Sequence, residues 1–136
     1  MILILVLEAF VNPETNTYDY SNYAAVSKDT ALTEQTLTST TSDQSVVYIT
    51  QSGIKITNSN IQKQSGDSSN TENSEFYGVN AAVLVNGGEL TMEGGTINTA
   101  AKGANSLCAT NNGKVTISGT TITSTGESSA RGLHAT

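Results

Sequence analysis

Residues 83–97, VLVNGGELTMEGGTI, decide the fold, because their pattern of five apolar positions recurs along the chain. Two short segments alternate between apolar and polar residues, and one further apolar residue stands alone, which is typical of strands with one buried face. The pattern recurs 36 residues earlier and 24 or 25 residues later. The aligned sets are Val83, Val85, Leu90, Met92 and Ile97; before them Val47, Ile49, Ile54, Ile56 and Ile61; after them Leu107, Ala109, Val115, Ile117 and Ile122. We expect three copies of one unit that stack and bury these columns together.

Incomplete copies lie on both sides of these three. Leu32 and Leu37 form a partial copy before the first, and Leu133 and Ala135 begin a fourth. Clusters of Asn and Gly separate the apolar segments, as in residues 86–88, NGG. These residue types tolerate positive φ, so we expect a tight corner at each cluster.

The repeat predicts both the fold class and the domain organisation. A unit of this length cannot close a core alone, so we expect an all-β fold, a right-handed parallel β-helix (solenoid) with about 24–26 residues per coil. An antiparallel sandwich is the alternative, because it also uses short alternating strands. We assign residues 31–136 to the coils, with the chain ending inside a coil like a fragment. Residues 1–30 are a separate segment, either a cap or a truncated leader, and residues 62–80 are an insertion loop.

The composition excludes several classes of protein. Apolar residues are 36% and charged residues 13%, whereas Thr, Ser, Asn and Gly make up 62 of the 136 residues, which argues against a helical bundle. The net charge is −6 and no Lys/Arg cluster is present, so we expect no nucleic-acid partner. The apolar run at residues 2–7 is too short to cross a bilayer, so we expect no membrane insertion by this segment.

Three quoted stretches carry a resemblance to a known family. They are TSTTSDQSVVYIT from residue 38, NTENSEFYGVNAAVLVNGGELTMEGGTI from residue 70, and GESSARGLHAT from residue 126. The chain resembles bacterial adhesin-like β-helix proteins of the pectate-lyase-like superfamily. The resemblance implies a secreted protein at the bacterial cell surface that acts as a binding or presentation scaffold. Its motifs are those of the repeat and not of a catalytic site.

The titratable residues do not form a convincing catalytic or metal site. Glycoside hydrolysis needs two carboxylates about 5–10 Å apart, but Glu89 and Glu93 have no acidic residue at the equivalent position of a neighbouring copy. Cys108 and His134 occupy one outward column with Tyr48 and Leu84, and two ligands are too few for a metal. We therefore predict no catalytic, cofactor-binding or metal-binding residues and no cofactor.

The insertion at residues 62–80 is the strongest candidate for a binding element, because insertions in repeat proteins often gather on the binding face. Its aromatic pair, Phe76 and Tyr77, either folds back over the stack or forms a lip in which Tyr77 stacks on a sugar. The candidate ligand-binding residues are Tyr77, Phe76 and Tyr48.

We therefore expect an adhesin-like extracellular scaffold without catalysis of its own, whose partner is a host or environmental glycan or a surface protein. Two alternatives remain open: a fragment of a polysaccharide lyase or hydrolase whose catalytic coils are elsewhere, and a purely structural spacer. An uncovered terminal coil is a pairing edge, so we also expect end-to-end self-association.

Overall fold

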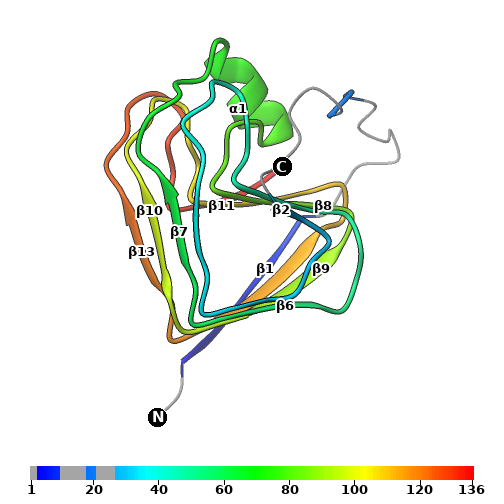
Figure 1. Cartoon of the computed structure of the whole chain (residues 1–136). Coiled ribbons are helices and arrows are strands. Elements are labelled where there is room, and N and C mark those ends of the chain that lie inside the picture. Colours follow the sequence, from blue (N-terminus) through cyan, green and yellow to red (C-terminus); the bar gives the residue numbers. More distant parts are fainter. Residues whose placement is uncertain (1–2, 10–17, 21–26) are drawn as a thin grey trace.

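The computed structural model describes residues 3–9, 18–20 and 27–136 and consists mainly of short strands in three sheets. The first sheet has the order β1 (Ile4–Glu8), β12 (Lys114–Ser118), β9 (Glu89–Glu93), β6 (Ile54–Thr57) and β3 (Leu32–Thr33). The second sheet has the order β13 (Thr121–Ser124), β10 (Thr96–Thr99), β7 (Asn60–Lys63) and β4 (Thr36–Thr38). The third sheet has the order β14 (Leu133–Ala135), β11 (Leu107–Thr110), β8 (Val83–Asn86), β5 (Val47–Ile49) and β2 (Ser27–Lys28). The helix α1 (Thr71–Tyr77) joins β7 to β8 and lies outside the sheets (Figure 1).

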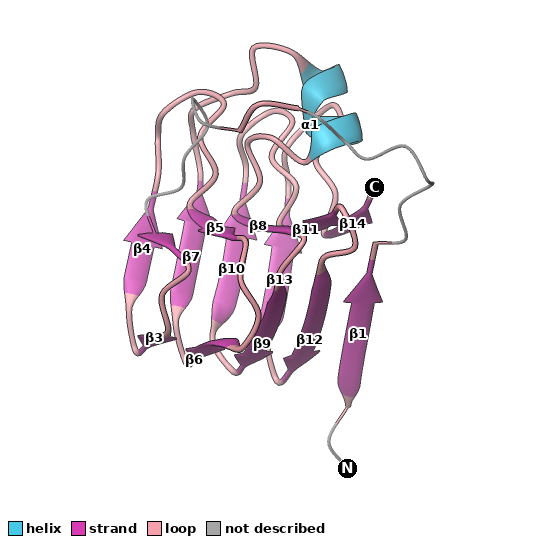
Figure 2. Cartoon of the chain, turned by 90° about the vertical axis from the view of Figure 1, so that its right-hand side faces the viewer, coloured by secondary structure: helices cyan, strands magenta, loops and turns pink. Residues whose placement is uncertain are grey.

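The predicted alignment of the sequence copies is confirmed by the strand register. Val83 lies between Val47 and Leu107, and Leu107 lies beside Leu133. Ile97 lies between Ile61 and Ile122 in the same way. All of these pairs are parallel, so equivalent positions of successive copies lie side by side (Figure 2).

The structure corrects the predicted fold class. The described chain forms three mostly parallel sheets with one helix, and the single right-handed parallel β-helix that we expected is not plainly formed. β1 pairs antiparallel with β12, and α1 interrupts the succession of strands. An apolar repeat specifies which strands are neighbours, but it carries no information about hand, about an antiparallel strand or about a helix without apolar periodicity. The antiparallel sandwich is not formed either, because every described strand pair except β1–β12 is parallel.

The apolar columns of the repeat form the core between the three sheets. The side chains of Ile49, Ile56, Ile61, Leu90, Met92, Ile97 and Leu107 are fully buried there. Corners between strands adopt the positive φ values that their Asn and Gly residues predicted, as at Asn58, Gly94 and Gly95. At Gly95 a Cβ atom would lie 2.1 Å from the carbonyl oxygen of Ser59, so only glycine lets the two corners approach.

The insertion differs from the loop that we predicted for residues 62–80. Its first two residues belong to β7, and its second half contains α1. The suggested cap or leader at residues 1–30 falls largely on residues 1–2, 10–17 and 21–26, which lie outside the described residues. In the part of the chain that the structure describes, no helix has the length and apolar character needed to cross a membrane.

Candidate functional site

The candidate site is built on α1, which short-range sequence signals define at both ends. The side chain of Asn70 accepts a hydrogen bond of 3.0 Å from the backbone N–H of Glu72 and caps the N-terminus. Gly78 ends the helix with φ 72°, and its N–H donates to the carbonyl of Ser74. A Cβ atom at Gly78 would lie 2.6 Å from Cys108 Sγ and 2.7 Å from Leu84 Cδ1, so the helix end is pressed against the third sheet.

Distant side chains bind the carbonyl groups at the C-terminal end of α1. Asn105 Nδ2 donates to the Ser74 carbonyl at 3.1 Å, and Tyr20 Oη donates to the Tyr77 carbonyl at 2.9 Å. The carbonyls of Glu75 and Phe76, which lie between those of Ser74 and Tyr77, bind residues in and directly after β14. His134 Nε2 donates to the Glu75 carbonyl at 2.6 Å, and Thr136 Oγ1 donates to the Phe76 carbonyl at 3.0 Å. The Ser74 carbonyl also accepts from the Gly78 N–H, whereas the carbonyls of the last residues of a helix have no partner in the next turn and need one from elsewhere. Their satisfaction by side chains far away in sequence holds a helix of only seven residues in a defined position.

The segment that precedes α1 is attached to the corners of neighbouring copies. Asp67 Oδ1 accepts from the backbone N–H of Lys102 at 2.9 Å, and the N–H of Ser68 donates to the carbonyl of Lys102 at 2.9 Å. The carboxylate of Asp43 accepts from the N–H of Ser69 at 2.9 Å and from its hydroxyl at 2.6 Å. The insertion is therefore bonded at both its beginning and its end.

Four tyrosines form a cluster between α1 and the third sheet. The rings of Tyr18 and Tyr77 are stacked, with centroids 4.2 Å apart, and the rings of Tyr20 and Tyr48 are stacked with centroids 5.8 Å apart. Tyr18 and Tyr20 meet edge to face at 5.2 Å. The cluster covers the buried side chains of Val79, Ala81, Leu84 and Cys108. Offset and edge-to-face pairs of this kind each add about 0.5–1.5 kcal/mol beyond the burial of their surface.

The three predicted ligand-binding residues differ in how far their side chains are exposed to solvent. Tyr48 is only 7% exposed, and its hydroxyl accepts a hydrogen bond of 2.8 Å from Asn86 Nδ2. Burial raises the pKa of Tyr48 above its ordinary value. Tyr77 is half-buried, with one face against Tyr18. Phe76 is 60% exposed. The structure thus brings Phe76 and Tyr77 together on α1 and places Tyr48 in the cluster beneath.

The predicted outward column of Tyr48, Leu84, Cys108 and His134 is confirmed by the register of the third sheet. The tyrosine cluster and the end of α1 cover it. Burial raises the pKa of Cys108 to about 12, so the thiol stays protonated and behaves as a small apolar side chain. His134 is engaged with the Glu75 carbonyl, as described above.

The acidic residues considered in the sequence lie on the surface. Glu93 forms an ion pair of 3.2 Å with Lys55, and Glu89 is exposed beside Lys114 in the first sheet. Among the described residues no group of three or more His, Cys, Asp or Glu side chains could hold a metal ion. The predicted lack of catalytic and metal-binding residues stays a prediction.

Sequence reasoning missed two features near the insertion. A polar hollow of about 310 Å³ is lined by Asp67, Ala100, Lys102, Thr125, Gly126 and Glu127. Lys63 is fully buried, and its Nζ donates to the carbonyl of Thr41 at 2.5 Å. Burial lowers the pKa of Lys63 to about 8, although the carboxylates of Asp43 and Asp67 act in the opposite direction. Lys63 aligns with Thr99 in the repeat. The alignment therefore indicated that this position is polar, but not that the lysine is buried.

No family model, curated protein or solved structure matches this chain. The resemblance to adhesin-like surface proteins therefore stays a prediction that the comparisons do not test.

Proposed function

We propose that this chain is a non-catalytic, adhesin-like binding scaffold at the bacterial cell surface, and that α1 presents its aromatic side chains to a glycan. One observation carries the proposal: Phe76 is 60% exposed on a short helix whose last four carbonyl groups are all bound by side chains from elsewhere in the chain. An exposed aromatic side chain on a backbone that is held in place can serve as the anchor of a binding site, because aromatic residues supply much of the binding energy at interfaces.

The chemistry around Phe76 suits a sugar. The negative π face of an aromatic ring attracts the slightly positive C–H groups on the apolar face of a pyranose. Binding sites combine such apolar surface with a few polar groups that fix orientation. Glu72 is exposed in the first turn of the same helix and can accept hydrogen bonds from sugar hydroxyls. The rigid attachment of α1 reduces the conformational entropy that binding would otherwise have to remove.

Two titratable groups beside α1, Cys108 and His134, support a role without catalysis. The Cys108 thiol is protonated and buried, and the imidazole of His134 is bound to a helix carbonyl. Neither group is in a position to act as a nucleophile or a general base towards a bound sugar.

The test is glycan-array binding of the full chain and of two variants. We expect saturable binding to one class of sugar, weakened about tenfold or more by Phe76→Ala. Ile4→Ala is the matched control, because Ile4 is also 60% exposed but lies on β1. Binding that survives Phe76→Ala would place the site elsewhere. Cleavage of a polysaccharide by the purified chain would favour the enzyme, and silence across the array would favour the structural spacer.

A further inference from the structure

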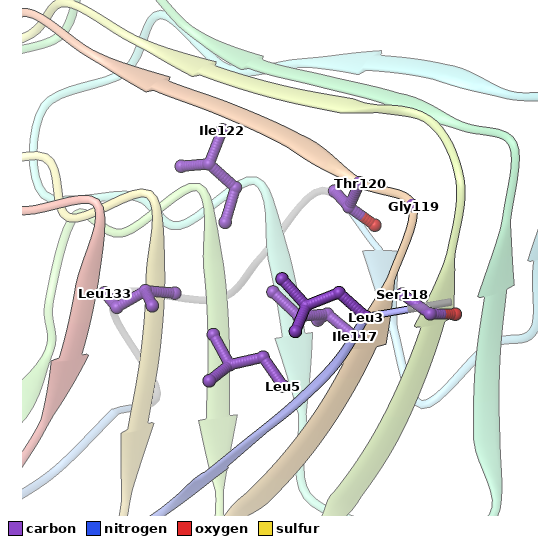
Figure 3. Close-up of a pocket in the computed structure, with 8 residues that line it drawn as sticks. All are labelled: Leu3, Leu5, Ile117, Ser118, Gly119, Thr120, Ile122 and Leu133. Carbon is purple, nitrogen blue, oxygen red and sulfur yellow. The ribbon is translucent and has the colours of Figure 1, made fainter. Parts of the chain in front are cut away.

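Two hollows among the described residues differ in chemistry. The larger, of about 540 Å³, is lined mostly by apolar side chains, and Leu3, Leu5, Ile122 and Leu133 point into it (Figure 3). It therefore offers few groups that could fix the orientation of a ligand. The smaller is the polar hollow of about 310 Å³ beside the insertion, whose lining carries two carboxylates, an ammonium group and a hydroxyl. The polar hollow has the groups that ligand selection requires.

The polar hollow forms where three parallel strands of the second sheet end. Asp67, Lys102 and Glu127 follow β7, β10 and β13 in the chain, and these strands are neighbours. Hydrogen bonds join the three segments: the Lys102 N–H donates to Asp67 Oδ1 at 2.9 Å, and the Gly103 N–H donates to the Glu127 carbonyl at 2.9 Å. The corners of the stack thus fix the shape of the hollow, so a ligand does not have to order it.

The polar groups of this hollow are available to a ligand. The side chains of Asp67, Lys102 and Glu127 are exposed, and within the described part of the chain none of the three forms an ion pair. The Thr125 hydroxyl donates to the Thr99 carbonyl at 3.3 Å, and its lone pairs can still accept. The hollow therefore presents hydrogen-bond donors and acceptors together.

The balance of charge favours a neutral ligand that is rich in hydroxyl groups. The Lys102 ammonium group offsets one carboxylate, and the buried Lys63 interacts electrostatically with Asp67. The carboxylates repel a polyanion, and the ammonium groups repel a polycation. Sugar hydroxyls suit both kinds of group, because a hydroxyl can donate to a carboxylate and accept from an ammonium group.

The loop of residues 125–131 connects the polar hollow with α1. Its first residues line the hollow, and its Ser129 hydroxyl and Arg131 guanidinium bind the Glu75 carboxylate at 3.3 and 3.0 Å. On α1, Glu72 is three residues before Glu75 and four before Phe76, so these side chains are neighbours on the helix surface. The hollow, Glu75, Glu72 and Phe76 therefore follow one another along the surface.

We propose that the polar hollow is a second subsite, which takes one neutral sugar residue of a glycan chain that also stacks on Phe76. This inference rests on the proposed function of α1. Exposed charges and hydrogen bonds each contribute little in water, so the hollow alone binds a monosaccharide weakly. A glycan that is already held at Phe76 presents its further residues to the hollow at a high effective concentration. The chain therefore binds long oligosaccharides more tightly than short ones.

The test is calorimetric titration of the full chain with neutral oligosaccharides of increasing length. The probes are oligomers of glucose from cellulose, of N-acetylglucosamine from chitin and of mannose from mannan, each from the disaccharide to the hexasaccharide. In at least one series we expect the dissociation constant to fall about tenfold or more with length. Glu127→Gln and Lys102→Met should each remove most of that gain. Glu34→Gln is the matched control, because Glu34 is also exposed but lies between β3 and β4, and it should keep the gain.

The outcomes distinguish this inference from the proposed function. Phe76→Ala should weaken binding at every length, whereas Glu127→Gln and Lys102→Met should weaken the binding of long oligomers. A gain with length that survives in both variants of the hollow would overturn the second subsite and leave the site on α1 standing. A dissociation constant that does not change with length would do the same, as would glycan-array binding without binding of any of these neutral oligomers. Silence on the array as well would overturn both proposals.

Discussion

His134 donates a hydrogen bond of 2.6 Å from Nε2 to the backbone carbonyl of Glu75, although the two residues are 59 positions apart. Arg131 strengthens the same connection, since its guanidinium lies 3.0 Å from the Glu75 carboxylate. The last strand, β14, is thereby joined to the helix of the insertion. The position of α1, and with it that of Phe76, depends on residues at the far end of the chain.

Replacement of His134 by Ala should loosen α1 without unfolding the sheets. The loss of one such hydrogen bond costs about 1 kcal/mol, so backbone amides of α1 should exchange with solvent about fivefold faster. Hydrogen exchange measured by mass spectrometry on the peptide that contains α1 checks this. His134→Gln retains a side-chain N–H donor and should restore much of the protection. Unchanged exchange in His134→Ala would mean that this bond does not hold the helix.

Substitution of two glycines by alanine distinguishes the cost of backbone strain from the cost of steric crowding. Gly53 and Gly78 have φ values of 79° and 72°, but a Cβ atom has nothing within 4 Å at Gly53 and two close side chains at Gly78. Gly53→Ala should lower the free energy of unfolding by about 1 kcal/mol through strain alone. Gly78→Ala should cost about 1–3 kcal/mol more, because Cys108 and Leu84 must move. Urea titration of both variants gives the difference, and equal losses would show that the helix end is not tightly packed.

The sequence predicted the strand neighbours well because the apolar positions of each copy are spaced alike. Every column that was aligned from Val83, Leu90 and Ile97 is a column of paired strands in the structure. The overall class was wrong, since nothing in that spacing signals β1 running antiparallel or the separation into three sheets with a helix.

The helix α1 was missed for a physical reason. Its sequence, TENSEFY, has no apolar face of helical period, and much of its stabilisation comes from side chains about 57–60 residues away. The caps at Asn70 and Gly78 were a usable signal. The candidate site was predicted only in part: Phe76 is accessible, whereas the burial of Tyr48 depends on Tyr20, which no repeat pattern connects with it.

Truncation of a core side chain should lower the free energy of unfolding most where the side chain has neighbours on both sides in its column. Ile97→Ala removes a fully buried side chain between Ile61 and Ile122, and it should cost about 2–5 kcal/mol. Ile122→Ala removes the same atoms from a side chain that is only partly buried, and it should cost about half as much. Urea titration of the two variants checks this. Equal losses would mean that Ile122 is covered as well as Ile97 in solution.

Lys63 should make stability depend on pH in a defined direction. Its pKa is lowered from 10.5 in the unfolded chain to about 8 in the folded chain, so between these values the unfolded state binds the additional proton. The free energy of unfolding contributed by this group therefore rises with pH, by about 2 kcal/mol between pH 8 and 9.5. Below pH 8 the penalty for burying the charged form is constant.

The Lys63→Met variant isolates this contribution. Its free energy of unfolding should lack the rise between pH 8 and 9.5 that the parent chain shows, when both are measured by urea titration. Lys55→Met is the control, because Lys55 is an exposed partner of Glu93, and it should keep the rise. Parallel pH profiles of the parent chain and Lys63→Met would contradict the burial of a titrating ammonium group.

The measurement that tests the central claim most directly is the ratio of glycan dissociation constants between Phe76→Ala and the parent chain. It is measured by calorimetric titration with the sugar class that the array identifies. We predict a ratio of about ten or more, with Ile4→Ala near one, because Phe76 stacks on the sugar and Ile4 does not. A ratio near one for Phe76→Ala, or no saturable binding to any glycan, would contradict the account.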